Sequence, residues 1–311
     1  MTVLTDKKIP TAGRQRSKMK KLWKRHGIGY AFLAPFLVLF FVFVLLPVFV
    51  GMGMSLFHYN LLQPAKFAGL ANYKALIFDD DVFLLSLQKT ILFAVIIGPA
   101  GYIASLMMAW VLNQLKLRSV FSFMFYIPSI TSAVAMTVIW QNFFSTDRFG
   151  LVNSILLKLN MIDQPILWNQ DVRTIFGVCA LISVWMSMGN GFLVFLAGFQ
   201  NLPAEINEQG RIDGIRNRVQ ELFYLTLPQM KPQLLFGAIN SIVTAFAVFD
   251  VPMQFAGFPS ANYAAHTIVA HMYDFAFVRF QMGYSSAIAV VLFAIMFILG
   301  RLCFRLLRSD D

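Results

Sequence analysis

Several polar side chains lie inside long apolar stretches of this 311-residue chain, where such groups are costly and therefore indicate a function. Ser183 and Ser187 are four residues apart and Asn190 follows three residues later, so the three share one face of a helix. Asn240 and Thr244 form a second pair at helical spacing. Hydroxyl and amide groups can hydrogen-bond a hydroxyl-rich solute. The alternative is that they bond between neighbouring helices, as such residues commonly do in membrane bundles.

Aromatic and acidic residues beside these pairs extend the same chemistry. Trp185, Phe246 and Phe249 offer flat apolar surface for the C–H groups of such a solute, and Asp250 lies at the end of its apolar stretch. We therefore predict that a solute path passes through these stretches.

Catalytic and metal-binding patterns are absent from the sequence. The motifs G-x-S-x-G, H-E-x-x-H and G-x-x-x-x-G-K-[ST] do not occur, and the four histidines lack metal-ligand spacing. The two cysteines, Cys179 and Cys303, both lie in apolar stretches and are interpreted as inert core thiols. The chain is therefore not expected to be an enzyme or to hold a metal.

The composition is that of a membrane protein, with 58% apolar and only 13% charged residues against about 25% charged in soluble domains. A helix needs about 20 uncharged residues to cross a hydrocarbon core about 30 Å thick. Five runs exceed that length and a sixth is slightly shorter. In chain order they are Gly27–Phe57, Thr90–Leu115, Ser119–Thr146, Thr174–Ala204, Pro232–Phe249 (the short one) and Phe280–Gly300. We predict an all-α integral membrane fold with six transmembrane helices in one domain, residues 27–308.

The segment Val251–Tyr273 is also uncharged, but prolines and glycines interrupt it, among them Pro252, Gly257 and Pro259. We interpret it as an external loop or a re-entrant segment.

The basic residues test this topology. They concentrate in the tail 1–26, in the loops after the second and fourth runs, and near the C-terminus. Because Lys and Arg remain on the cytoplasmic side, six spans with both termini in the cytoplasm are predicted, including the end 309–311. The net charge of +10 is therefore a topology signal and predicts no nucleic-acid partner. The first run is too long for a signal peptide and is expected to be retained.

The cytoplasmic segment 202–232 has the pattern of a helical elbow. Pro203 suits the first turn of a helix, Asp213-Gly214 is a turn signal, and Pro228 and Pro232 are expected to end the second helix. We predict an amphipathic helix–turn–helix at the inner face of the membrane. The alternative is an interfacial helix that only anchors the loop.

This elbow resembles the cytoplasmic EAA loop of permease subunits in binding-protein-dependent ABC importers. The matching residues are Glu208, Asp213, Gly214, Leu227, Pro228 and Pro232, whereas Gln209-Gly210 replaces an Ala pair and Ile215 a further Ala. Four other stretches are similar to carbohydrate-type permeases, and together they resemble the larger-type maltose permease subunit. These are Leu33–Pro47, Gly69–Tyr73, Phe149–Leu156 and Met282–Leu292.

The resemblance implies a type I ABC importer fold and a multi-pass subunit of a bacterial inner membrane, surrounded by lipid. It also implies a second permease subunit, an extracytoplasmic sugar-binding protein and a cytoplasmic ATPase dimer that binds the ATP and Mg, with no cofactor in this chain. The elbow residues expected to meet the ATPase are Glu205, Glu208, Gly210, Asp213, Gly214 and Pro228.

The same resemblance places four of the path residues, Ser187, Asn190, Asn240 and Thr244, where a related permease contacts its sugar. Phe246 and Asp250 join them on their chemistry alone. The expected substrate is a mono- or oligosaccharide, with a polyol or glycerol phosphate as the alternative. A membrane sensor or scaffold and a membrane-embedded enzyme are the competing classes, and co-purification of an ATPase and a second permease would distinguish the transporter from both.

Overall fold

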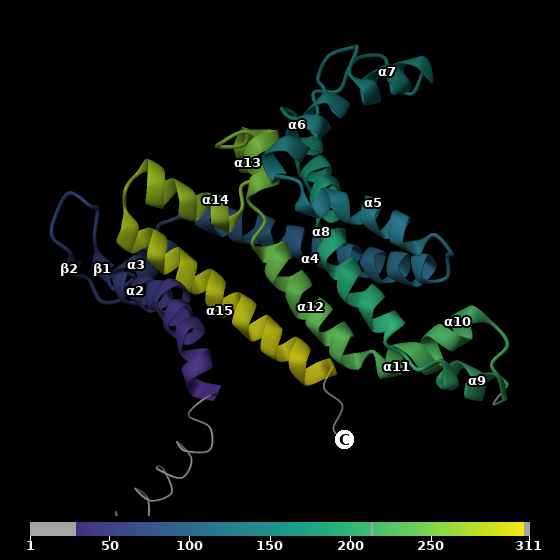
Figure 1. The fold of residues 1–311 in the computed structure, drawn as a ribbon. Coiled ribbons are helices and arrows are strands. Elements are labelled where there is room, and N and C mark those ends of the chain that lie inside the picture. Colours follow the sequence, from purple (N-terminus) through teal and green to yellow (C-terminus); the bar gives the residue numbers. More distant parts are fainter. Residues whose placement is uncertain (1–28, 213, 308–311) are drawn as a thin grey trace, which may run out of the picture. The chain divides into compact units, whose positions relative to one another are not determined.

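The computed structural model describes residues 29–212 and 214–307 (Figure 1). The predicted basic tail 1–26, Asp213 of the elbow and the C-terminal end 309–311 lie outside the described residues. The chain divides into two compact units, residues 1–53 and 54–311.

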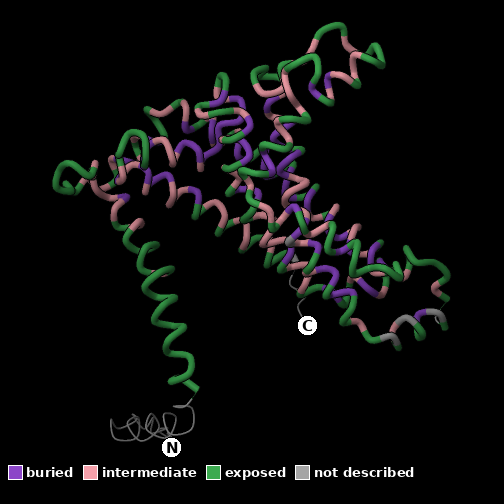
Figure 2. Tube along the Cα trace, turned by 45° about the horizontal axis from the view of Figure 1, so that its top comes forward, coloured by how far each residue is buried: buried purple, intermediate pink, exposed green. Residues whose placement is uncertain are grey.

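The described residues of the first unit form one apolar helix. It begins at Gly29, passes through a π-helical turn, η1 (Phe41–Leu45), and continues as α2 (Leu46–Met54). Its 26 residues are enough to cross a membrane, since a helix of that length extends about 39 Å. Its large side chains are exposed along its length (Figure 2), with Phe32 83% exposed. A helix that is apolar on all sides requires lipid or another protein around it.

The second unit is built on four long helices, α4 (Asp81–Asn113), α8 (Val172–Gln200), α12 (Lys231–Phe246) and α15 (Met282–Leu307). Helix α4 packs along α8 and α12, and α12 packs against α15. Small residues allow α4 and α8 to approach closely: Gly101 faces Ser187, and the Ser105 hydroxyl donates to the Met188 carbonyl at 2.8 Å. Such contacts are typical of helix packing in membranes.

Helix α4 begins nine residues before the predicted start of its run at Thr90. The Asp80 carboxylate accepts a hydrogen bond from the Phe83 N–H at 2.8 Å and so caps the helix. Asp81 and Lys89 interrupt the uncharged run without interrupting the helix. Charge therefore marks where the apolar part of this helix begins, and the cap marks where the helix itself begins.

The predicted third span is bent. Its run divides into α5 (Arg118–Ile130) and α6 (Ala133–Phe143), which meet at an angle of 98°. Thr131 and Ser132 between them are extended, with ψ of 143° and 132°, and this redirects the chain. The described residues therefore hold five helices that could each cross a membrane, or six if the bent pair is one span.

The segment predicted as an external loop or a re-entrant segment is a compact set of short helices. They are α13 (Asp250–Ala256), the 3₁₀ turn η3 (Ala261–Tyr263), α14 (Ile268–Tyr273) and the π-helical η4 (Asp274–Val278). Phe255 and Ile268 are almost completely buried and belong to the main apolar core. The apolar residues between the prolines and glycines give these turns a face to bury, so the segment is folded, and its assignment as an external loop or a re-entrant segment stays a prediction. The segment packs on α4, α6, α8 and α15.

Shorter elements complete the unit. A hairpin of β1 (Phe57–His58) and β2 (Lys66–Phe67) precedes α3 (Ala71–Phe78), which packs on α4 and α15. Helix α7 (Leu151–Lys158) follows α6.

The predicted elbow is confirmed as helical. It consists of α9 (Ala204–Ile212), α10 (Arg218–Glu221), the π-helical η2 (Leu222–Thr226) and α11 (Leu227–Gln229). Helical residues run without a break from Arg218 to Gln229, so the second elbow helix ends one residue after Pro228, as predicted, and Pro232 lies in the first turn of the next helix, α12. Proline is tolerated there because the first-turn N–H groups have no intrahelical partner.

Two buried clusters hold the second unit together (Figure 2). The larger one joins the first half of α4 to α8, α13 and α14, around Phe93 and Ile182. The smaller joins the last half of α4 to the end of α8 and to the elbow, where Leu222 and Met230 pack with Leu106. The elbow and the start of α4 are thus at opposite ends of a helix about 50 Å long.

Candidate functional site

A cavity of about 210 Å³ opens where α4, α5, α8, α12 and α13 meet. We call it the path cavity. Its polar lining residues are Ser129, Ser183, Ser187, Thr244 and Asp250, and its apolar ones include Ile97, Met186 and Phe249. None of the described residues that line it is a Lys, Arg or His. The wall therefore offers hydroxyl groups and one carboxylate.

The serine and threonine hydroxyls that line the path cavity differ in their hydrogen bonds within the protein. Ser129, Ser187 and Thr244 donate to carbonyls of their own helices at 2.8–2.9 Å, which leaves their oxygens able to accept further bonds. The Ser183 hydroxyl is buried and has no hydrogen-bond partner among the described residues. An unsatisfied buried hydroxyl costs about 1–3 kcal/mol. Because the Ser183 oxygen itself has almost no accessible surface, a ligand hydroxyl would remove that cost once the side chain turns toward the cavity.

Three of the predicted path residues, Ser187, Thr244 and Asp250, meet at this cavity. Asn240 lies beside them, in a small adjoining space that Ser187 and Thr244 also line. Phe246 is elsewhere: it is 6% exposed and lines an apolar cavity between α4, α12 and α15. Asn190 lies on α8, and its side chain is outside the described part of the structure.

Ser129 was missed by the sequence reasoning. It lies next to Pro128 on α5, where Ser122, Tyr126 and Ser129 have the same spacing of four and three residues as the polar residues of α8, a signal that the sequence reasoning did not use. Gly189 of α8 lies directly against the Ser129 side chain, so only a residue without Cβ allows α5 this close to the path cavity. Because that contact joins two helices, the spacing of residues along one helix does not predict it.

At the other end of the second unit, the elbow turns sharply after α9. Gly214 has φ of +92°, and the Ile215 N–H donates to the Gly210 carbonyl at 2.9 Å. This pattern, a left-handed glycine followed by a bond back to the last helical turn, is the Schellman termination. Asn217 then caps α10 by accepting from the Gln220 N–H at 2.7 Å. The Asp213-Gly214 turn signal therefore has a clear structural basis.

The elbow exposes an apolar surface, and a buried side chain anchors that surface to the apolar core. Ile212 is 86% exposed and Tyr224 73%, Val219 and Phe223 are also exposed, and so are Glu205 and Glu208 on α9. We call Ile212, Val219, Phe223 and Tyr224 the elbow patch. Leu222, between them in the sequence, is 2% exposed and anchors the patch to the second buried cluster. Exposed apolar residues of this kind commonly mark a protein contact.

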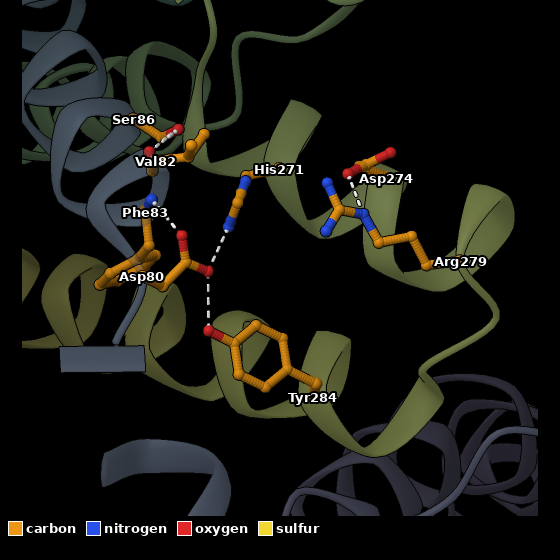
Figure 3. A network of polar contacts seen from close by, with 8 residues as sticks. All are labelled: Asp80, Val82, Phe83, Ser86, His271, Asp274, Arg279 and Tyr284. Carbon is orange, nitrogen blue, oxygen red and sulfur yellow. Dashed lines mark hydrogen bonds and ion pairs between the residues drawn. The ribbon is translucent and has the colours of Figure 1, made fainter. Parts of the chain in front are cut away.

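A third polar arrangement lies at the start of α4 (Figure 3). Asp80 accepts a hydrogen bond from the Tyr284 hydroxyl at 2.7 Å, and its Oδ2 lies 2.9 Å from His271 Nε2. Burial alone raises the pKa of Asp80. The hydrogen bonds from Tyr284, His271 and the Phe83 N–H outweigh burial and hold the pKa below its usual value. This outer cluster ties the starts of α4 and α15 to α14.

A second histidine lies beside the cluster. His266 is 4% exposed, stacks on Phe258 and meets His271 edge-on, with ring centroids 5.7 Å apart. Burial lowers the pKa of His266 to about 4, and the nearby His271 adds to that effect. The imidazole is therefore neutral at physiological pH. No group of three or more His, Cys, Asp or Glu side chains in the described ranges could hold a metal ion.

Comparison with known proteins places these features in a family. The family model described as "Binding-protein-dependent transport system inner membrane component" matches residues 101–309. The chain is similar to the arabinooligosaccharides transport system permease protein AraP of Bacillus subtilis (30% identical, covering 97% of this chain and 95% of AraP). It is also similar to the lactose transport system permease protein LacF of Rhizobium radiobacter (31% identical, covering 94% and 96%).

A solved structure shares the fold. It is a chain of a bacterial ABC transporter involved in the import of the acidic polysaccharide alginate, with a TM-score of 0.78 at 18% identity. The match covers 94% of this chain and 99% of that one.

Proposed function

The chain belongs to the family of binding-protein-dependent transport system inner membrane components, and from that premise we propose that it carries a mono- or oligosaccharide across a bacterial inner membrane. Its several apolar helices are those of a multi-pass membrane protein and permease subunit. The observation that carries the substrate proposal is the path cavity, with its unpaired Ser183 hydroxyl.

The chemistry of the cavity favours a compound with many hydroxyl groups. Ser and Thr hydroxyls exchange hydrogen bonds with sugar hydroxyls, and the Asp250 carboxylate accepts from them. Phe249 adds an aromatic ring to the same wall. A polyol or glycerol phosphate is the alternative substrate, and the second permease subunit would supply the rest of the lining that it meets. The relatives AraP and LacF are named for arabinooligosaccharides and lactose.

The elbow would couple transport to ATP hydrolysis by a separate subunit. In this proposal a cytoplasmic ATPase dimer binds ATP and Mg and contacts the elbow patch together with the exposed Glu205 and Glu208 of α9. Movement of the patch would pass through Leu222 and Met230 to α4 and α8, because these side chains share one buried cluster. Gly210, Gly214 and Pro228 set the shape of the elbow, and Asp213 adjoins it.

The remaining partners follow from the same proposal. A second permease subunit would complete the path, and an extracytoplasmic binding protein would deliver the sugar to the end opposite the elbow. Both termini would be cytoplasmic, in accord with the basic residues of the tail and the elbow. A sensor or scaffold would not need a polar cavity between its spans.

Uptake by a path-cavity variant tests the substrate proposal. Ser183→Ala removes the unpaired hydroxyl without breaking a bond inside the protein, so the assembled transporter should remain intact. We expect the sugar concentration for half-maximal uptake to rise about five-fold, the equivalent of one hydrogen bond of about 1 kcal/mol. Ser119→Ala, on the exposed start of α5, is the matched control and should change nothing. Equal uptake curves for the two variants would contradict this use of the cavity.

A further inference from the structure

A second polar pocket lies at the end of the unit opposite the elbow, between the β1–β2 hairpin, α3 and the start of α15 (Figure 1). We call it the hairpin pocket. Its volume is about 420 Å³, twice that of the path cavity and within the range of about 300–1,000 Å³ usual for small-molecule sites. Its polar lining side chains include those of His58, Tyr59, Asn60, Gln63, Lys66 and Gln281, and the Asn60 oxygen already accepts a hydrogen bond from the Gln63 N–H at 3.0 Å.

The walls of the pocket are held in place independently of any ligand. The Asn72 side-chain amide donates to the carbonyls of Ser55 at 2.8 Å and Phe57 at 3.0 Å, which joins α3 to β1. The Gly283 N–H donates to the Tyr59 carbonyl at 3.2 Å, which joins α15 to the hairpin. A Cβ at Gly283 would collide with the Phe57 carbonyl, so this approach requires glycine. The pocket is therefore preformed.

Its chemistry differs from that of the path cavity. Lys66 and His58 face each other across the hairpin as register partners, and none of the described residues that line the pocket is acidic. Asn60, Gln63 and Gln281 add amide groups, which both donate and accept. This combination recognises hydroxyl groups together with a negative charge, and Lys66 supplies the positive charge at neutral pH.

Aromatic rings complete the wall. Tyr59 and Tyr284 both line the pocket, and such rings pack on the C–H face of a sugar. The Tyr284 hydroxyl is already bonded to Asp80, so its ring is held in one orientation by the outer cluster. A ligand on that ring would therefore contact the residue that joins α15 to the start of α4.

We propose that the hairpin pocket binds a saccharide unit that carries a carboxylate, such as a hexuronic acid, before the sugar enters the path cavity. The inference rests on the proposed saccharide transport and narrows its substrate class to sugars that include an acidic unit. A small molecule fits better than a partner protein's surface because the pocket is concave and its walls are fixed.

The test is binding of galacturonate and galactose to the full chain assembled with its partner subunits in lipid nanodiscs, without the binding protein. Calorimetric titration should show galacturonate binding more tightly than galactose. Lys66→Gln should weaken galacturonate binding about five-fold, as expected for a charge-assisted contact of about 1 kcal/mol at an exposed site. Lys74→Gln removes the same charge from an exposed position on α3 outside the pocket and should have no effect.

Other outcomes would overturn the proposal. Equal affinity for the two sugars, no binding, or loss of binding in Ser183→Ala with retention in Lys66→Gln would exclude an acid-selective hairpin pocket. If Lys66→Gln instead weakens only the association of the binding protein, the pocket is a docking contact. Sugar-stimulated ATP hydrolysis by the same complex tests the proposed saccharide transport separately from binding in the hairpin pocket. If sugars stimulate hydrolysis but the pocket does not bind, only the hairpin inference fails.

Discussion

Acidification should loosen the segment around His266. Its pKa is about 4 in the folded protein and about 6.5 in an unfolded chain. Between these values the unfolded state binds more protons, so stability falls as pH falls from 6.5 to 4 and is fully present above 6.5. For a change from pH 7 to pH 5 the linkage amounts to about 2 kcal/mol. Asp80 adds a loss in the same direction only at lower pH, as its carboxyl takes up a proton.

The groups around His266 determine that value. Burial and the neighbouring His271 and Arg279 oppose its protonation, and Asp274 and Asp80 favour it less strongly. His266→Phe keeps an aromatic ring between Phe258 and Tyr263, whose rings it contacts, and removes the titration. Hydrogen exchange of the segment 258–273 should rise from pH 7 to pH 5 in the wild type, after correction for the intrinsic pH dependence of exchange.

Two histidine variants distinguish titration of His266 from a general effect of acid on the protein. His266→Phe should abolish most of the extra exchange, whereas His58→Gln, at an exposed position on β1, should leave it unchanged. The same pH response in His266→Phe and the wild type would refute the reasoning.

Three further predictions concern the two ends of the second unit. Tyr284→Phe removes the 2.7 Å hydrogen bond to Asp80 and should lower the free energy of unfolding by about 1.5–3 kcal/mol. Thermal unfolding should then begin at a lower temperature. An unchanged unfolding temperature would show that the outer cluster does not stabilise the fold. Leu222→Ala opens a cavity beneath the elbow patch and should cost about 2–5 kcal/mol, measured as faster proteolysis of the elbow than in Tyr224→Ala. Gly214→Pro cannot adopt φ of +92° and should abolish uptake while leaving the chain in the membrane, with Gly214→Ala intermediate; normal uptake by the proline variant would remove the coupling role of the turn.

The transmembrane helices could be predicted from the sequence because lipid restricts which segments can cross it. A helix in hydrocarbon must be long and uncharged, so the runs predicted the spans well where no charge lies near a helix end. The runs placed the start of α4 too late because Asp81 and Lys89 lie inside that helix. They missed the bend at Thr131–Ser132 because a backbone change at two residues leaves the run uncharged.

The sites were predictable to different degrees. The elbow has a local signal, since Gly214 must adopt a conformation that glycine prefers, and the turn lies between two helical patterns. Ser187 and Thr244 were found because each belongs to a pair at helical spacing, yet which of the pairs meet depends on packing between α8 and α12. The outer cluster had no sequence signal, because Asp80 lies about 200 residues from Tyr284 and finds it only in the folded chain.

Transport by the assembled complex tests the central claim most directly. The chain should co-purify with a second permease subunit and an ATPase and, once reconstituted in liposomes with its binding protein, should accumulate labelled saccharide only when ATP is supplied. Ser183→Ala should shift the sugar dependence, and Gly214→Pro should stop accumulation. A complex that lacks an ATPase, or one that hydrolyses ATP without moving any saccharide, would contradict the account.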